Sequence, residues 1–250
     1  MMRYLRLVII LFLSSNIFAQ NIDRFEKANQ LYNQEKFQEA IELYKTILDS
    51  GEESPALYYN LGNSYYKQSN IGPSIYYYEK ALQLAPGDED ILNNLAFAQN
   101  STIDKIDVMP QGFVTKFLNS ITNLFAIDGW AWVSVVGIVG FVILMLLYFT
   151  AISSAKKRLF FLTSWVFLFL GVIAITFAFK QSTDLINTQY AIVFSQESDV
   201  KNEPNLRSDE VFKLHEGTKI QITDTVSNWK KIRLADGKIG WIPTSDIKEL

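Results

Sequence analysis

Two apolar stretches decide the fold class: GWAWVSVVGIVGFVILMLLYFTAISSA spans residues 129–155, and LFFLTSWVFLFLGVIAITFAF spans residues 159–179. Neither stretch contains Asp, Glu, Lys or Arg. Each exceeds the ~20 residues that an α-helix needs to cross ~30 Å of hydrocarbon. We therefore predict membrane-spanning helices at 127–155 and 159–179. The alternative is a helical hairpin buried in a soluble protein, but no soluble part of the chain is large enough to cover two such helices.

A short basic segment between the two stretches predicts their orientation. Lys156, Lys157 and Arg158 form a loop that the positive-inside rule places in the cytoplasm. Trp130 and Trp132 are then expected at the outer interface, where amphipathic rings prefer to lie. Because neither stretch carries an ionisable side chain, an ion or proton pathway has no carrier, which excludes a transporter.

The N-terminus has the features of a secretory signal peptide at residues 1–19. Met1–Arg6 is basic, Leu7–Leu13 is apolar, and Ala19 supplies a small residue for cleavage. Ile17 stands where a small residue is preferred, so a retained membrane anchor is the alternative. In both cases the chain that follows is exported, which agrees with the orientation of the apolar stretches. Both soluble regions are thus predicted to lie outside the cytoplasm.

An internal repeat of about 34 residues fills most of residues 20–100. Its clearest copy reads Tyr58-x-x-Leu61-Gly62-x-x-Tyr65, followed by Ser74, Tyr78, Ala81 and Pro86. One period earlier the register recurs as Ala28, Leu31, Ala40, Tyr44 and Ile47, and one period later as Leu92 and Leu95. The pattern resembles a tetratricopeptide repeat, which implies two repeats and a capping helix at about Glu89–Gln99. So short a stack buries its core incompletely, so we expect further burial against the membrane-proximal segment or a partner protein.

The groove of such a stack is lined by the first helix of each repeat. The predicted partner-binding positions are Phe25, Asn29, Tyr32, Tyr59, Asn60, Asn63, Tyr66 and Asn94. Some tetratricopeptide domains clamp a partner's C-terminal carboxylate with Asn and Lys here, but Phe25 stands where that clamp needs Lys. A Tyr/Asn groove suits an extended peptide instead, because Tyr supplies rigid apolar area and Asn bonds backbone groups. For each tyrosine the alternative is a place in the core, where Tyr65 and Tyr78 are assigned by register.

Residues 101–126 connect the repeats to the first apolar stretch. Their apolar residues lie on one stripe of a 3.6-residue period: Phe113, Val114, Phe117, Leu118, Ile121, Leu124 and Phe125. Next to a membrane span, such a stripe predicts an amphipathic helix in the outer interface. The alternative is a helix packed on the repeat domain.

After a linker at 180–189, the C-terminal region 190–250 changes to short β-branched runs. The candidate strands are Tyr190–Phe194, Glu210–Leu214, Lys219–Asp224, Trp229–Leu234 and Lys238–Ile242. Turn chemistry is supplied by Glu216-Gly217, Ser227-Asn228 and Asp236-Gly237. The segments Asn228-Trp229-Lys230-Lys231-Ile232 and Gly240-Trp241-Ile242-Pro243 resemble a bacterial SH3 domain, a small all-β barrel.

The resemblance to SH3 domains implies a binding surface at Trp229 and Pro243. Alternation along the strand assigns Ile232 to the core and Trp229 to the outer face. In peptide-binding SH3 domains a Trp and a Pro at these places line a proline-rich groove. The aromatic expected shortly after the Pro is here Ile247, which argues against standard proline-rich recognition.

Composition excludes several classes of function. The 250 residues carry 23 Lys+Arg against 26 Asp+Glu, so nothing indicates a nucleic-acid partner. No cysteine is present, which removes disulfides, thiol nucleophiles and Cys-ligated metals. The single histidine, His215, precedes a turn without an acidic or nucleophilic partner at motif spacing, and we predict that it is solvated. We predict no catalytic residues, no metal site and no cofactor, and hence a protein that is not an enzyme.

The order of these parts resembles the BatE family of the bacterial aerotolerance (Bat) operon: signal peptide, α-helical tetratricopeptide repeats, two transmembrane helices and a C-terminal SH3-like barrel. The resemblance implies a two-pass inner-membrane protein with both soluble domains periplasmic. It also implies partners among other Bat proteins, including ones with von Willebrand A-type domains. We therefore predict a scaffold that assembles a stress-related membrane complex. The alternative is a peptidoglycan-binding module, since other bacterial SH3 domains bind the cell wall.

Overall fold

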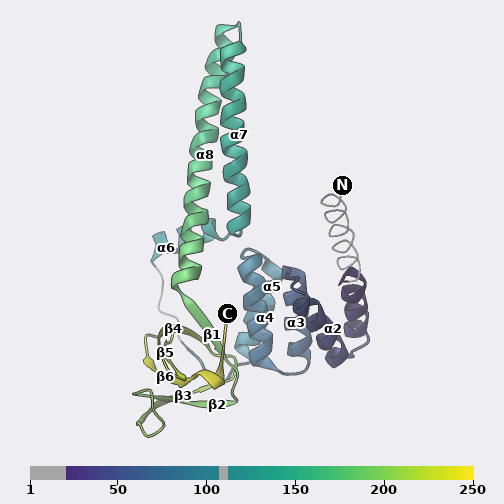
Figure 1. Ribbon diagram of the computed structural model, residues 1–250, viewed down its shortest axis with the longest axis vertical. Coiled ribbons are helices and arrows are strands. Elements are labelled where there is room, and N and C mark those ends of the chain that lie inside the picture. Colours follow the sequence, from purple (N-terminus) through teal and green to yellow (C-terminus); the bar gives the residue numbers. More distant parts are fainter. Residues whose placement is uncertain (1–20, 107–111) are drawn as a thin grey trace, which may run out of the picture. The chain divides into compact units, whose positions relative to one another are not determined.

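A computed structural model describes residues 21–106 and 112–250 of the chain, which form two compact units (Figure 1). Of the described residues, the repeat–sheet unit contains those up to Leu84, 88–106 and Tyr190–Leu250. The hairpin unit contains Ala85–Gly87 and 112–189. The predicted signal peptide at 1–19 lies outside the described residues.

The first part of the repeat–sheet unit is a stack of antiparallel helices. Helical residues 21–33 are followed by α2 (Phe37–Asp49), α3 (Pro55–Lys67), α4 (Ile71–Leu84) and α5 (Glu89–Asn100). Ser54 caps α3 by accepting from the Leu57 N–H, and Asp88 caps α5 in the same way, so local chemistry fixes both helix starts. Glu35 and Ser69 both adopt positive φ in the turns between paired helices. They stand one period apart, so the repeat is present in the backbone as well as in the sequence.

Helix packing in the stack depends on small residues, as the repeat register predicts. A Cβ added at Gly62 would lie 2.6 Å from two ring carbons of Tyr78, which is 1% exposed. The Ser74 hydroxyl donates to the Gly62 carbonyl at 2.9 Å and holds α4 against α3. Tyr65, assigned to the core, is only half-buried, and it stacks on buried Tyr77 with ring centroids 5.5 Å apart.

The second part of the repeat–sheet unit is an antiparallel sheet in the order β3-β2-β6-β5-β4-β1-β7. Its strands are β1 (Gln189–Val193), β2 (Glu197–Lys201), β3 (Glu210–His215), β4 (Lys219–Val226), β5 (Trp229–Arg233), β6 (Ile239–Pro243) and β7 (Ile247–Glu249). A short 3-10 turn, η1 (Thr244–Asp246), precedes β7. The core consists of apolar residues from most of these strands, among them Val193, Val200, Ile220, Ile232 and Ile242.

Five of the strands match the predicted runs to within two residues at either end, and the sequence analysis missed β2 and β7. Strand β2 is polar, with only Ser198 and Val200 buried, and β7 is three residues long. The three predicted turns are present. Gly217 and Gly237 adopt φ of +89° and +92°, which side chains rarely tolerate, and Ser227 adopts φ of +51°.

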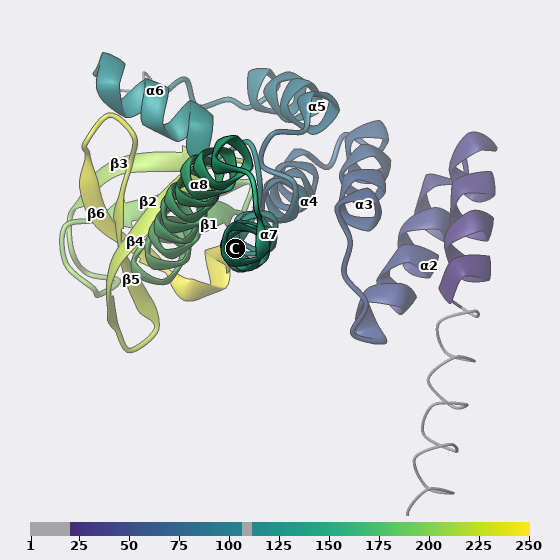
Figure 2. The same cartoon turned by 90° about the horizontal axis from the view of Figure 1, so that it is seen from above.

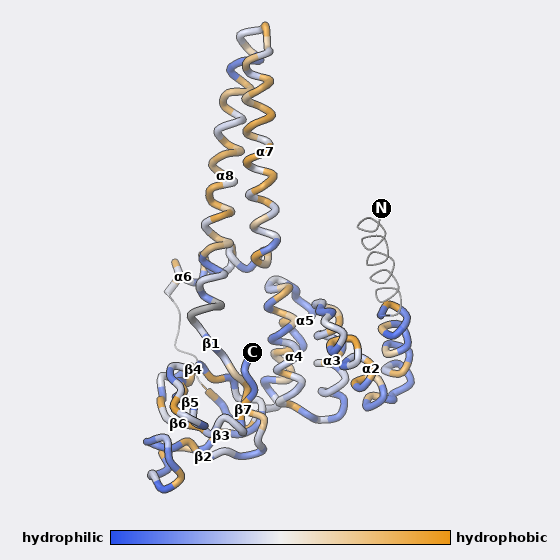
Figure 3. Tube along the Cα trace, in the orientation of Figure 1, coloured by the Kyte–Doolittle hydropathy of each residue, from blue (hydrophilic) through white to orange (hydrophobic). Residues whose placement is uncertain are grey.

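The hairpin unit contains α6 (Phe113–Thr122), α7 (Ile127–Thr150) and α8 (Ser154–Asn187). By length and composition alone, α7 and residues 154–184 of α8 could each cross a membrane. Figure 3 shows apolar residues along most of both helices and hydrophilic residues at the two ends of α8. The basic segment Lys156–Arg158 lies in the first turn of α8 rather than in the connection, which is Ala151–Ser153. The predicted linker at 180–189 is also helical up to Asn187, where the ion pair Lys180–Asp184 (2.8 Å) supports one turn.

Close contact between α7 and α8 is made by glycine and small polar residues. A Cβ at Gly137 would lie 2.8 Å from the Gly171 Cα, so only glycine allows the backbones to approach this closely. The buried hydroxyls of Ser134 and Ser164 donate to carbonyls of their own helices. Trp130 is buried in the hairpin unit and Trp132 is 70% exposed. The expected place of both rings at the outer membrane interface stays a prediction.

Candidate partner-binding surfaces

The four asparagines of the predicted groove belong to a hydrogen-bonded network that recurs with the period of the sequence repeat. In the first copy, the Asn29 Oδ1 accepts from the Tyr44 hydroxyl (2.6 Å) and from the Asn60 Nδ2 (2.9 Å). In the second copy, the Asn63 Oδ1 accepts from the Tyr78 hydroxyl (2.6 Å) and from the Asn94 Nδ2 (3.0 Å). The three members of the second copy each stand one period after their counterparts. We call these six residues the asparagine ladder.

The ladder fixes the orientation of its asparagine side chains. Burial is the main cause that raises the pKa of Tyr44 to about 12, and burial likewise raises the pKa of Tyr78. Both phenols are therefore neutral donors at physiological pH, and each saturates one lone pair of its asparagine. Tyr78 was assigned to the core alone; the rings of Tyr44 and Tyr78 are buried, but their hydroxyls also organise the groove. The signal that could have revealed this is the common spacing between each asparagine and its tyrosine.

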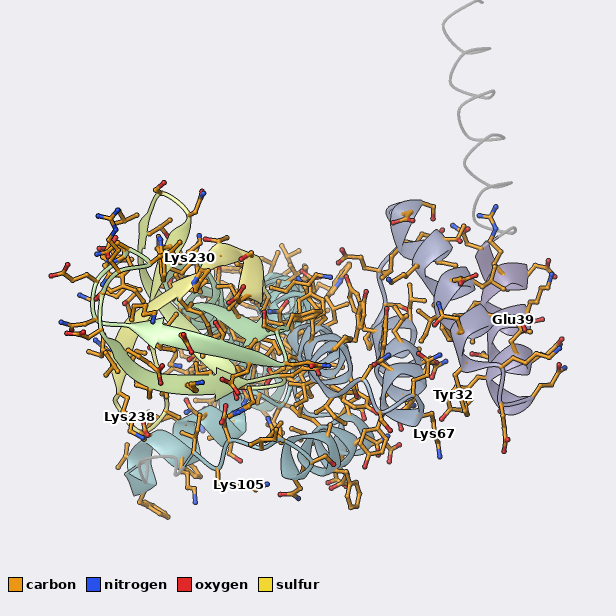
Figure 4. All side chains as sticks on the ribbon, turned by 90° about the horizontal axis from the view of Figure 1, so that it is seen from below. Tyr32, Glu39, Lys67, Lys105, Lys230 and Lys238 are labelled. Atoms are coloured by element: carbon orange, nitrogen blue, oxygen red, sulfur yellow. The ribbon has the colours of Figure 1, made fainter. Side chains whose placement is uncertain are left out.

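The remaining predicted groove residues are half-buried around the ladder. Tyr59 accepts from the Asn94 Nδ2 at 2.8 Å and packs against the Tyr78 ring at 6.0 Å. Burial and the neighbouring Tyr59 raise the pKa of Tyr32, whose ring meets Phe37 edge-on at 5.3 Å. Phe25 packs against the Tyr44 ring, and Tyr66 has no ring contact within the described part of the chain. Figure 4 labels Tyr32 among the side chains of the first repeat.

The second candidate surface lies on the outer face of the C-terminal sheet. Trp229 on β5 stands directly opposite Pro243 on β6, and Lys231 stands opposite Trp241. Lys231 lies 5.8 Å from the centroid of the Trp241 ring. Alternation puts all four side chains on one face, as the sequence predicts for Trp229 and Pro243. Trp241 was missed as part of this surface.

The comparisons with known proteins agree with both parts of the fold. Residues 25–89 match the family model described as a tetratricopeptide repeat, and residues 198–248 match the model of the bacterial SH3 domain. The chain contains both modules. A search of curated proteins found no match to the chain. Ile247, which replaces an aromatic of the peptide-binding SH3 groove, belongs to the core of this SH3 domain.

The SH3 domain is joined to the repeats by a partly buried carboxylate that the sequence analysis missed. Asp104, just after α5, accepts from the His215 N–H (2.7 Å) and from the Thr218 hydroxyl (2.5 Å). Its other oxygen lies 2.7 Å from the His215 Nδ1. The prediction of a solvated His215 is therefore wrong, because its partner is distant in sequence and no motif spacing relates the two. Burial acts to raise the pKa of Asp104, but the hydrogen bonds from Thr218 and His215 outweigh it and hold that pKa below its usual value.

Further contacts join the SH3 domain to α4. The Gly72 N–H donates to the Glu216 Oε1 at 2.9 Å, and the Lys219 Nζ lies 2.7 Å from the Glu79 Oε2. A Cβ on Gly217 would lie 2.8 Å from the Thr102 side chain, so the glycine also permits close packing. In the structure, the chain's own SH3 domain packs on the last paired helix of the repeats. That the membrane-proximal segment or a partner protein also covers the repeats stays a prediction.

A lysine of the SH3 domain completes this interface, which we call the repeat–SH3 seam. The Lys248 Nζ lies 4.3 Å from the Tyr76 ring centroid, 5.6 Å from that of Tyr77 and 5.7 Å from that of Phe194. Burial lowers the pKa of Lys248, and the positive charges of Lys45 and Lys80 lower it further. Aromatic faces attract a cation, so this contact holds β7 against α4.

Proposed function

We propose that the protein is a membrane-anchored scaffold that binds an extended segment of a partner protein in the groove of its repeats. The asparagine ladder carries this proposal. It holds polar side chains in fixed orientations beside half-buried tyrosines, and pre-organised groups bind a peptide at lower entropic cost. The proposal assigns the chain no catalytic activity.

The membrane part of the proposal rests on the hairpin unit. Large apolar side chains cover the outside of α7 and α8, for example Leu146 at 60% and Phe169 at 66% exposure. Contiguous apolar surface of this extent indicates a lipid or protein environment rather than water. We propose that the hairpin spans the bacterial inner membrane with its short connection in the cytoplasm and both domains outside. By its resemblance to the BatE family, the scaffold would serve a Bat-type stress complex, whose von Willebrand A-type members are candidate partners.

The second candidate function is cell-wall binding through the SH3 domain. The observation that favours it is the outer sheet face, where two indole rings and Pro243 stand on adjacent strands. Partly exposed aromatic rings such as those of Trp229 and Trp241 can stack on the sugar units of a glycan strand, and Lys231 could pair with peptidoglycan carboxylates. Wall binding alone gives the repeats no role, so we favour the scaffold.

The full-length chain is needed to test these functions. Deleting residues 190–250 would strip the α4 contacts and leave Asp104 without its partners, so a deletion would confuse lost binding with lost folding. Point variants avoid this problem. Tyr32→Ala with Tyr66→Ala removes two half-buried groove aromatics that make no hydrogen bond in the asparagine ladder, and Gln83→Ala on exposed α4 surface is the control.

The measurement is affinity purification from detergent-extracted membranes with mass spectrometry, run beside co-sedimentation with isolated sacculi. The scaffold predicts that the double tyrosine variant loses its partners and that the control keeps them. Buried aromatic anchors often contribute ~2 kcal/mol or more each to such interfaces, so the loss should be about 30-fold or larger. Retained partners in the tyrosine variant, with sedimentation lost in Trp229→Ala, would favour wall binding instead.

A further inference from the structure

Helix α6 is followed by a short connection to α7 at residues 123–126, which we call the elbow. Hydrogen bonds from α7 and α8 hold the elbow and the last residue of α6. The Trp130 Nε1 donates to the Thr122 carbonyl at 2.9 Å. The Gln181 Nε2 donates to the same carbonyl and to the Phe125 carbonyl, both at 3.1 Å. These bonds satisfy the carbonyl of Thr122, the last residue of α6, which has no intrahelical donor, and that of Phe125 in the connection to α7. The direction of α6 relative to α7 and α8 is therefore fixed by polar contacts from both long helices.

The elbow lies at one end of the apolar length of the hairpin. On α8 the charge-free run ends at Phe179, and Lys180 and Gln181 follow directly. A run of this length covers the ~30 Å of a hydrocarbon core, so Gln181 would lie at the boundary between hydrocarbon and headgroups. Since Gln181 bonds the elbow, the C-terminal end of α6 is at the same depth.

Helix α6 extends sideways from this level. In Figure 1 it lies at the foot of the hairpin, and in Figure 2 it is seen from its side while α7 and α8 are viewed nearly end-on. A helix that lies across a membrane-spanning hairpin at the end of its apolar length runs along the membrane surface.

The apolar stripe of α6 faces the side on which the hairpin extends. Ile121, at the centre of the stripe, packs against the cluster of Trp130, Ala174 and Ala178, which belongs to the apolar part of the hairpin. Phe117 stands one turn before Ile121, and Phe113 stands one turn before Phe117, so both follow the same direction. Phe113 is 84% exposed and Phe117 is 56% exposed. Within the described residues nothing covers them.

We propose that α6 is an interfacial helix that inserts the first four residues of its apolar stripe, Phe113, Val114, Phe117 and Leu118, into the outer leaflet of the bilayer. The proposal rests on the proposed spanning of the membrane by α7 and α8. The occupant of this face is lipid rather than protein, because Ile121 of the stripe packs on the apolar cluster of the hairpin at the level where the proposed hydrocarbon core ends. Thr115 and Lys116 stand on the opposite side of the helix and would face water.

Spin labelling tests the proposal, and the absence of cysteine makes the natural chain a ready background. The labelled variants are Phe117→Cys on the stripe, Thr115→Cys on the polar side, and Val139→Cys in the middle of α7. All three positions are exposed, so a label breaks no internal packing. The protein is reconstituted in vesicles of phosphatidylethanolamine and phosphatidylglycerol. Collision with oxygen, which concentrates in hydrocarbon, is compared with collision with a water-soluble nickel chelate.

The oxygen-to-nickel collision ratio is expected to be highest for the label at Val139, intermediate at Phe117 and lowest at Thr115. A labelled peptide free in water gives the reference value, and the ratio should exceed this reference at Phe117 and fall below it at Thr115. A Phe117 label exposed to nickel, beside a Val139 label in lipid, would overturn the interfacial helix and leave the spanning hairpin intact. A Phe117 label shielded from both reagents would also overturn it, because the stripe would then be packed on protein. A Val139 label exposed to nickel would overturn the spanning hairpin itself, and the proposal for α6 with it.

Discussion

Replacing Asp104 by alanine should destabilise the repeat–SH3 seam more than any other single truncation outside the apolar cores. The carboxylate has a side chain only 14% exposed, and it holds the His215 N–H, the His215 ring and the Thr218 hydroxyl. A hydrogen bond to a charged group contributes about 1.5–3 kcal/mol. Because the bonds share one acceptor group they are not additive, and we expect a total loss of roughly 3 kcal/mol.

The pH dependence of this loss has a definite sign. The folded-state pKa of Asp104 lies below its unfolded value, so the carboxylate contributes stability at all pH values above the unfolded pKa. That contribution is lost as the pH falls through the lowered folded pKa. The difference in unfolding free energy between the parent and Asp104→Asn should therefore shrink as the pH falls below about 4.

Two measurements check the prediction in the full-length protein in detergent. Denaturant unfolding gives the change in free energy, and hydrogen exchange gives the protection of the His215 amide, which donates directly to Asp104. We expect faster exchange at His215 in Asp104→Ala, with the amides of α2 unchanged. Equal unfolding midpoints and equal protection of His215 in parent and variant would refute the role assigned to Asp104.

Four further predictions follow from packing and topology. Gly62→Leu should cost about 1–3 kcal/mol or more by forcing Tyr78 aside, measured as a lower unfolding midpoint, and an unchanged midpoint would contradict the repeat register. Gly137→Leu should separate α7 from α8 and lower the melting temperature of the hairpin in micelles, whereas Gly137→Ala should have a smaller effect. Lys248→Met should cost ~0.5–1 kcal/mol through the lost cation–π contact, with Lys248→Arg as the variant that keeps it. Reporter fusions should be active in the cytoplasm at Ile152 and outside it after Leu250, and the same location at both would disprove the two-pass topology.

Local patterns in the sequence were enough to predict most elements of the fold. The charge-free runs predicted α7 and most of α8, because crossing hydrocarbon requires only a long apolar segment. The spacing of Gly62, Ala81 and Pro86 predicted the repeat register, since close helix approach and helix termination depend on residue type at single positions. The glycines at 217 and 237 predicted two turns of the sheet, because a tight turn also depends on the residue type at a single position.

Boundaries were predicted less well where local signals compete. The basic segment Lys156–Arg158 interrupts hydropathy and was assigned to a loop, but its residues are good helix formers and α8 begins before them. Strand β2 was missed because its charged residues obscure the alternation that buries Ser198 and Val200. Its strand conformation depends on pairing with β3 and β6, which no local window contains.

The groove was predicted in its membership but not in its bonding. Register alone placed the four asparagines on one side of the stack, because residues at equal repeat positions share an environment. The bonds from Tyr44 and Tyr78 depend on the distance between paired helices, which the sequence does not state. Whether this groove binds a peptide stays a prediction.

The sequence by itself determined the parts of this protein: the two apolar helices, the repeat register and the turns of the sheet, each of which depends on neighbouring residues. Only the tertiary structure decided how the repeats and the SH3 domain combine. Asp104 meets His215, Gly72 meets Glu216, and Lys248 meets Tyr76 across more than a hundred residues of chain. None of these pairs has a sequence signature, because a hydrogen bond or a cation–π contact requires proximity rather than spacing. The same holds for the elbow after α6, where Gln181 on α8 donates to the carbonyls of Thr122 and Phe125, which precede the whole of α7 in the chain.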